Sequence, residues 1–98
     1  MAKLEGLLGI CVRAGQAVFG EDNCMKTLRA GQCVALLMDE GISENVRKKY
    51  EGICERSDTV CRTVPEGLIE QATGKTGMAV GIRKGSLGTQ ILDLLQKQ

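Results

Sequence analysis

The chain has 98 residues, enough for one domain with a hydrophobic core, and its formal net charge is +1. This charge excludes a strong overall attraction to nucleic acid or to a membrane surface, so any such binding has to be local. Histidine, the commonest general base and metal ligand, is absent, and Phe19 and Tyr50 are the only aromatic residues, which argues against a platform for stacking bases.

The cysteines indicate a reducing environment. Their odd number, five, and the lack of any C-x-x-C pair argue against a disulfide framework or a zinc site. Neither a signal-like apolar segment near the N-terminus nor an apolar run of membrane-spanning length is present in the sequence. We therefore expect a cytoplasmic protein without membrane association, metal or cofactor. Four cysteines lie in apolar or periodic patterns and are expected to be small buried residues: Cys24, Cys33, Cys54 and Cys61.

The first predicted element is an amphipathic helix that starts near Leu4 and ends at Gly15. Gly6 and Gly9 lie within it and predict close packing against a sheet. A short strand at 17–19 follows. The later elements are expected in this order: a helix within 20–31, a buried strand at 33–38, a helix capped by Ser43, a strand at 58–64, a short helix with Pro65 in its first position and Gly74 at its end, a buried strand at 78–82, and a helix capped by Ser86.

Helices and strands thus alternate at short spacing along the chain. Such alternation predicts an α/β domain with helices on both faces of a small sheet. No linker or shift in composition divides the sequence, so we expect a single domain over residues 1–98.

The stretch from Gly20 to Gly31 is the one around which the chain is organised. Asp22, Lys26 and Arg29 have the spacing that puts side chains on one face of a helix. A helix start with free backbone N–H groups and basic side chains behind it is suited to bind phosphate or nucleic acid. An ordinary polar surface helix is the alternative interpretation. The opposite face carries residues that can pack inward: Cys24, Met25 and Leu28.

No catalytic set is expected. Residues 74–77, Gly-Lys-Thr-Gly, superficially resemble the end of a phosphate-binding P-loop, but Ile69 stands where that motif requires glycine. NTP hydrolysis is therefore excluded, and the segment is interpreted as a tight loop that Lys75 makes mildly attractive to anions. Without histidine, no nucleophile, base and orienting residue can be assembled, so we expect no enzymatic activity.

The pattern Gly20-x-Asp22-x-x-x-Lys26-x-Leu28-x-x-Gly31 resembles the signature of a family of kink-turn RNA-binding ribosomal proteins. This family is of the L-seven-Ae and L-thirty-e type, and its signature reads G-x-N-E-x-x-K-x-[LI]-x-x-G. The resemblance runs over most of the chain. The segments 7–10, 13–15 and 20–22 are most similar to the small bacterial branch called YlxQ-like, and 69–74 loosely matches a second family segment, L-G-x-A-x-G.

The resemblance implies a three-layer α/β/α sandwich with a small mixed sheet. It also implies that the protein binds structured RNA, either a kink-turn or ribosomal RNA, through tandem sheared G·A pairs whose groove is opened by the kink. Small-molecule substrates are not implied, and a monomer is favoured although the oligomeric state stays open. The implied RNA-binding residues are Gly20, Glu21, Asp22, Asn23, Lys26, Arg29, Lys75, Thr76 and Gly77.

Most of these positions have an implied role. Gly20 allows close backbone approach, Lys26 contacts a phosphate or a guanine edge, and residues 75–77 cap the flipped-out nucleotide. Asp22 occupies the position of the family's asparagine, and Asn23 occupies that of its glutamate.

The sequence also departs from the family. Asp22 lacks the amide donor of asparagine, Glu21 adds a second carboxylate, and the capping loop at 75–77 is polar and short, without the family's proline. These departures leave a second function open: a protein–protein interaction module on the same fold, with a degenerate RNA site.

Overall fold

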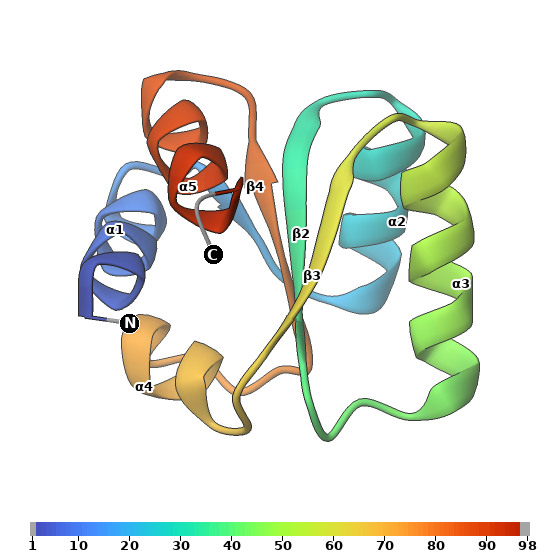
Figure 1. Ribbon diagram of the computed structural model, residues 1–98, viewed down its shortest axis with the longest axis horizontal. Helices are drawn as coiled ribbons and strands as arrows, with labels where there is room; N and C mark the ends of the chain where they lie inside the picture. Colours follow the sequence, from blue (N-terminus) through green and yellow to red (C-terminus); the bar gives the residue numbers. More distant parts are fainter. Residues whose placement is uncertain (1, 97–98) are drawn as a thin grey trace.

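Helices and strands alternate throughout residues 2–96, the part of the chain that the computed structural model describes; Met1, Lys97 and Gln98 of the predicted domain lie outside it. The three-layer α/β/α arrangement predicted from the sequence is confirmed (Figure 1). The elements are α1 (Ala2–Arg13), β1 (Ala17–Val18), α2 (Glu21–Arg29), β2 (Cys33–Asp39), α3 (Glu44–Arg56), β3 (Val60–Val64), α4 (Leu68–Thr73), β4 (Ala79–Arg83) and α5 (Ser86–Gln96).

The sheet is mixed, as the resemblance implied. Its strand order is β1-β4-β2-β3, with β4 antiparallel to both of its neighbours and β2 parallel to β3. In the parallel pair, Ala35 lies opposite Val60 and Asp39 lies opposite Val64. The central position of β2 explains why its sequence shows no alternation of polar and apolar residues, because both of its faces are covered.

Two hydrophobic cores lie on the two sides of the sheet. Figure 1 shows α1, α4 and α5 on one side and α2 and α3 on the other. Successive β2 residues point to opposite faces, so Leu37 belongs to the first core and Leu36 to the second. Other members of the first core are Leu8, Ile69, Val80 and Ile91, and other members of the second are Cys24, Leu28, Met38 and Tyr50.

The predicted starts of one helix and one strand are wrong. The short helix does not start at Pro65, because the Pro65 carbonyl accepts the Leu68 N–H at 3.1 Å in a turn, and Gly67 then adopts a left-handed φ of 83° before α4 begins. Gly74 ends α4 in the left-handed conformation, as predicted. The strand predicted from Asp58 begins only at Val60, since Asp58 has a φ of 53° and forms part of a turn.

Among the other predicted boundaries, one helix cap is confirmed, and a second helix cap and a strand start are wrong. The Ser43 hydroxyl accepts the Val46 N–H at 3.4 Å, which confirms this cap. By contrast, Ser86 is already the first residue of α5, and it is the Gly85 carbonyl that accepts the Thr89 N–H at 2.9 Å. Met78 also differs from expectation, since it precedes β4 and is 50% exposed.

Two further sequence expectations concern small residues. A Cβ at Gly9 would lie 3.3 Å from the Ala72 carbonyl oxygen, so this glycine permits close packing of α1 against α4 and not, as predicted, against the sheet. A Cβ at Gly6 would meet nothing within 4 Å. Cys24, Cys33 and Cys54 are buried as predicted, but Cys61 is only half-buried.

Candidate nucleic-acid interface

The candidate interface starts at the N-terminal end of α2. Gly20 flanks the helix with a φ of 90°, a conformation that favours glycine, and no side chain caps the end. Its carbonyl accepts the Cys24 N–H at 2.9 Å, which closes the first helical turn. Glu21, Asp22 and Asn23 are all exposed around this end. Backbone N–H groups of the first turn therefore remain available to a ligand, beside acidic and amide side chains.

Buried contacts fix α2 against the sheet. Cys24 and Leu28 have no exposed surface, as the sequence predicted for this face. The Cys24 thiol donates a hydrogen bond to the Val18 carbonyl at 3.2 Å, which ties the helix to β1. Thr27 is also buried, and its hydroxyl donates to the Asn23 carbonyl at 2.7 Å. The start of α2 is thus held rigidly over β1.

The loop at 75–77 begins where α4 ends. The Gly74 N–H donates to the Glu70 carbonyl at 2.8 Å, and the Lys75 N–H donates to the Thr73 hydroxyl at 3.2 Å. From there the Lys75 ammonium lies over the Phe19 ring, 5.5 Å from its centroid. Because Phe19 precedes Gly20, this contact connects the loop to the start of α2.

The structure brings these two segments together around one surface hollow, here named the loop hollow. It has a volume of about 470 Å³. Gly20 and Glu21 contribute from the start of α2, and Thr76 and Gly77 contribute from the loop. The remaining lining residues are Gly41, Ile42, Ser43, Val46, Tyr50, Met78 and Ala79.

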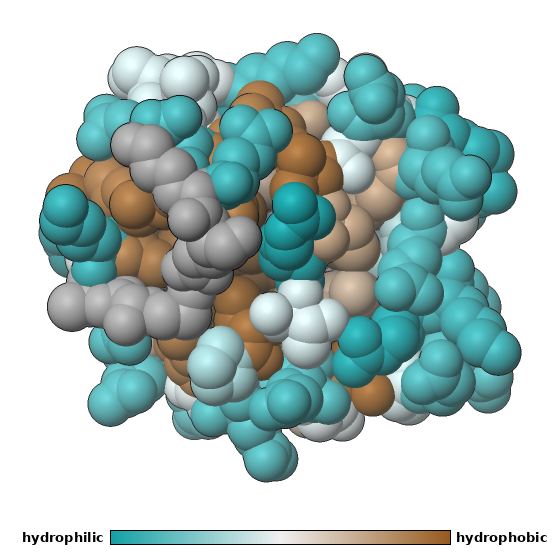
Figure 2. Space-filling view, viewed as in Figure 1, coloured by the Kyte–Doolittle hydropathy of each residue, from teal (hydrophilic) through white to brown (hydrophobic). Residues whose placement is uncertain are grey.

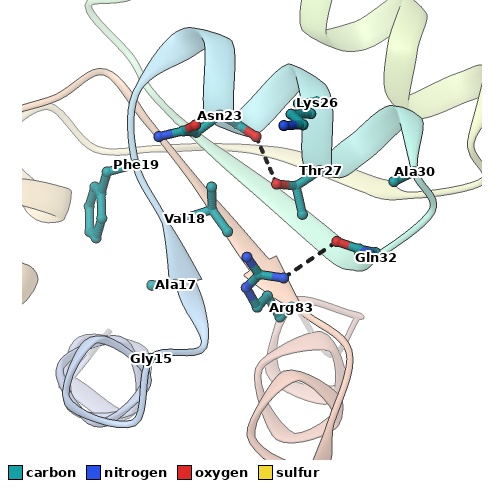
Figure 3. A pocket seen from close by; sticks show the side chains of 10 residues that line it. All are labelled: Gly15, Ala17, Val18, Phe19, Asn23, Lys26, Thr27, Ala30, Gln32 and Arg83. Carbon is teal, nitrogen blue, oxygen red and sulfur yellow. Dashed lines mark hydrogen bonds between the residues drawn. The ribbon is translucent and has the colours of Figure 1, made fainter.

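Asn23 and Lys26 line a second hollow, here named the strand hollow, of about 510 Å³ (Figure 3). It extends along β1 to the end of β4, where Gln32 and Arg83 complete its wall. Phe19 also lines it and directly precedes Gly20, which lines the loop hollow, so the chain passes from one hollow to the other at residues 19–20.

Arg29 is separated from these groups. It lines another hollow, of about 450 Å³, together with Arg56 and Ser57 near the C-terminal end of α3. Of the nine predicted residues, four line the loop hollow, two line the strand hollow and Arg29 lies apart. Asp22 is exposed at the start of α2 and Lys75 contacts Phe19, but neither lines one of these hollows.

Sequence reasoning missed three residues of the two hollows. Met78 was expected in a buried strand, yet its exposed side chain lines the loop hollow. Gln32 and Arg83 lie one residue outside the predicted strands at 33–38 and 78–82, and no role was expected for them. The sequence held one indication of their position: a polar residue next to a buried strand has to lie at the edge or the end of the sheet.

Asp39 is a buried residue that positions the loop hollow. Its carboxylate accepts the Gly41 N–H at 2.7 Å and the Gly67 N–H at 2.9 Å, and its own N–H donates to the Met78 carbonyl at 2.7 Å. Three chain segments therefore meet at one residue, Asp39, which is 4% exposed. The predicted strand at 33–38 stopped one residue before Asp39, which the structure places at the end of β2.

Tyr50 is the titratable group with a perturbed pKa that lines the loop hollow. Burial raises its pKa, and the neighbouring Cys24 and Glu21 raise it further, so the phenol stays neutral. Among residues 2–96, no three Cys, Asp or Glu side chains gather in a way that could hold a metal ion. What the two hollows offer a ligand is hydrogen-bond donors, two cations, one exposed apolar side chain and the Glu21 carboxylate.

Comparisons with known proteins establish the fold of the chain. No protein-family profile and no curated protein matches the sequence. Among solved structures, a Bacillus halodurans protein of unknown function superposes with a TM-score of 0.89 at 22% identity, covering 98% of this chain and 99% of that one. A Giardia lamblia 15.5 kD RNA-binding protein has a TM-score of 0.78 at 14% identity, over 98% of this chain and 84% of its own.

A larger protein contains a similar domain. The archaeal translation termination factor aRF1 superposes with a TM-score of 0.65 at 24% identity, covering 86% of this chain but only 24% of its own. At these identities the likeness is one of fold. Within residues 2–96 no helix is long and apolar enough to span a lipid bilayer.

Proposed function

We propose that this protein binds structured RNA through the start of α2 and the loop at 75–77. The observation that carries the proposal is the meeting of these two segments around the loop hollow, while Asn23 and Lys26 of α2 line the strand hollow. The Lys75–Phe19 contact holds the two segments together. Backbone N–H groups of α2, the Asn23 amide and the Lys26 ammonium then face one ligand surface, as recognition of base edges beside phosphates requires.

The RNA is proposed to be a kink-turn or a related motif. In a regular A-form duplex the major groove is too deep and narrow for side chains to enter, whereas a kink beside sheared G·A pairs opens it. Asp22 and Glu21 are exposed acceptors that suit the amino groups of purine edges. Asn23 supplies an amide donor one residue after the family's position for it.

Met78 is proposed to take the part of an apolar capping loop. It follows the polar residues 75–77 and is 50% exposed at the wall of the loop hollow. An extruded base can pack its face against this flexible thioether, which adapts to irregular surfaces. The polar loop would then not need the family's proline to provide an apolar contact.

The fold likenesses support this proposal. The Giardia protein is described as RNA-binding, and aRF1 is a translation termination factor. We accordingly propose a non-enzymatic, cytoplasmic role in association with ribosomal or other translation-related RNA.

The proposal is tested by comparing the affinity for a standard kink-turn RNA with the affinity for the same RNA whose G·A pairs are replaced by Watson–Crick pairs. Fluorescence anisotropy at two salt concentrations separates base-edge recognition from phosphate attraction. We expect the G·A pairs to be required for tight binding at both concentrations. Equal affinity for the two RNAs would contradict kink-turn recognition, and no binding to either would contradict the RNA-binding function.

A second candidate, a protein-interaction module, is favoured by a different surface. Ile10 is 41% exposed and lines a groove between α1 and α5 with Leu7 and Leu94. Apolar patches lie over these helices in Figure 2. A concentration-dependent mass in light scattering, lost in an Ile10→Ser variant, would favour this function. A constant monomer mass together with G·A-dependent RNA binding would exclude it.

A further inference from the structure

We propose that Arg83 binds a backbone phosphate of the RNA inside the strand hollow, opposite Lys26. The inference rests on the proposed RNA-binding function and extends the contact surface from the start of α2 to the end of β4. Arg83 lies outside the two segments proposed above to bind RNA, the start of α2 and the loop at 75–77.

The lining of the strand hollow is suited to an anion. Lys26 and Arg83 contribute two cations from different elements, and Asn23 and Gln32 add amide groups. None of the ten lining residues is acidic. Figure 3 shows Arg83 and Lys26 at opposite sides of the hollow, with Thr27 and Val18 between them. A phosphate between the two cations would meet attraction from both.

The backbone of Arg83 is fixed on two sides. Its N–H donates to the Gln16 carbonyl at 2.9 Å. Its carbonyl lies directly against Gly88 of α5, where a Cβ would collide with it. The absence of a side chain at Gly88 therefore lets α5 hold the end of β4 in place.

The side chain of Arg83 is oriented by Gln32. One guanidinium nitrogen, Nη1, donates to the Gln32 Oε1 at 3.5 Å. Gln32 is itself held, because its N–H donates to the Thr27 carbonyl at 3.1 Å and its carbonyl accepts the Lys84 N–H at 3.0 Å. A guanidinium has five N–H donors, so most of its donor capacity remains after one bond to Gln32. Arg83 is half-buried and preorganised, which lowers the entropy lost when it binds phosphate.

The experiment compares three variants of the full chain: Arg83→Gln, Arg83→Lys and the control Arg62→Gln. Arg62 is an exposed arginine on β3 whose guanidinium donates to the carbonyl of Cys61. Anisotropy titrations use the kink-turn RNA at about 50 and 200 mM KCl, a range over which phosphate contacts change affinity strongly. Circular dichroism melting of each variant checks the fold.

We expect Arg83→Gln to weaken binding about tenfold at the lower salt concentration, as the loss of one charge-assisted contact predicts. The slope of log affinity against log salt should become shallower by roughly 0.7–0.9. Arg83→Lys should keep the slope while losing part of the affinity, because lysine keeps the charge but not the planar fork. Arg62→Gln should behave as the wild type.

Two results would overturn the inference while leaving the proposed function intact. The first is that the wild-type protein binds the RNA, and Arg83→Gln and Arg62→Gln have the same affinity and the same salt slope. The second is that titration with inorganic phosphate alone shifts the Arg83 side-chain NMR signal to saturation, whereas Arg83→Gln has no effect on RNA affinity. That result would assign the hollow to free phosphate. A wild-type protein that binds no RNA would instead contradict the proposed function.

Discussion

The ammonium nitrogen of Lys75 lies 5.5 Å from the centroid of the Phe19 ring. Phe19 directly precedes Gly20, and Lys75 opens the loop at 75–77, so this one contact joins the two segments proposed to bind RNA. The negative face of an aromatic ring attracts a cation, most effectively where water is partly excluded. The loop is exposed, and this attraction is therefore one of the few restraints on its position.

Replacing the ring tests that restraint. Phe19→Leu keeps an apolar side chain but removes the π face, so we expect faster amide hydrogen exchange at residues 75–77. The free energy of unfolding should fall by about 0.5–1 kcal/mol, the value of an exposed cation–π contact. Lys75→Met is the matched variant and should give the same increase in exchange. Unchanged exchange in both variants would show that the backbone bonds at Gly74 and Lys75 hold the loop without the ring.

Lys26 should contribute one phosphate contact. Lys26→Ala is expected to weaken RNA binding. The slope of log affinity against log salt concentration should become shallower by slightly less than one, about the value of one phosphate contact. Lys48→Ala removes an equally exposed lysine from α3 and should leave both quantities unchanged. The measurement is a salt series of binding titrations, and an unaltered slope in Lys26→Ala would remove this residue from the site.

Asp39 should be important for stability. Asp39→Ala leaves the N–H groups of Gly41 and Gly67 without their acceptor, and we expect a loss of about 1–3 kcal/mol in the free energy of unfolding. Asp39→Asn keeps one acceptor oxygen and should lose less. Urea denaturation measures both, with the exposed Asp22→Ala expected to stay within about 0.5 kcal/mol of wild type as control. Equal stabilities for Asp39→Ala and Asp22→Ala would contradict this role.

Two glycine-to-alanine changes should have opposite effects. A Cβ at Gly88 would collide with the Arg83 carbonyl and press on the Val34 side chain, so Gly88→Ala should destabilise the protein by about 1–3 kcal/mol. Gly6 lies in α1 with nothing near its missing Cβ, and Gly6→Ala should stabilise by about 0.5–1 kcal/mol. Thermal denaturation gives the melting temperatures of both variants, and a change of the same sign in both would refute the packing argument.

Cys61 should be the most readily alkylated thiol of the chain. A hydrogen bond from Cys54 lowers the pKa of Cys61 below its ordinary value of 9.0 despite the opposing effects of burial and Glu51, and Arg62 and Arg47 lower it as well. Its thiolate therefore forms at lower pH, and Cys61 is half-buried whereas the other four cysteines are buried.

Iodoacetamide labelling followed by peptide mass spectrometry as a function of pH should show this order. Burial raises the pKa of Cys33 to about 11, so Cys33 should react only at much higher pH. Cys54→Ala removes the donor and should shift the labelling midpoint of Cys61 to higher pH. A midpoint unmoved by that change would contradict the assigned cause.

The positions of the strands and helices were largely predictable because their causes are local. The spacing of Cys24 and Leu28 fixes the buried face of α2, and the Ser43 cap marks the start of α3. Predictions failed where several turn signals competed, as at Pro65 and Gly67. There the left-handed glycine next to the helix, and not the proline, sets its first residue.

The candidate site depended on both the local sequence and the tertiary structure. The sequence by itself determined the α/β alternation, the polar start of α2 and the presence of Lys26 behind it, because propensity, periodicity and glycine conformation act over a few residues. Only the tertiary structure placed Arg83 across from Lys26, exposed Met78 at the loop hollow and buried Asp39 at the junction of three segments. These relations join residues far apart in the chain, and strand order and sheet register decide them through the packing of both cores.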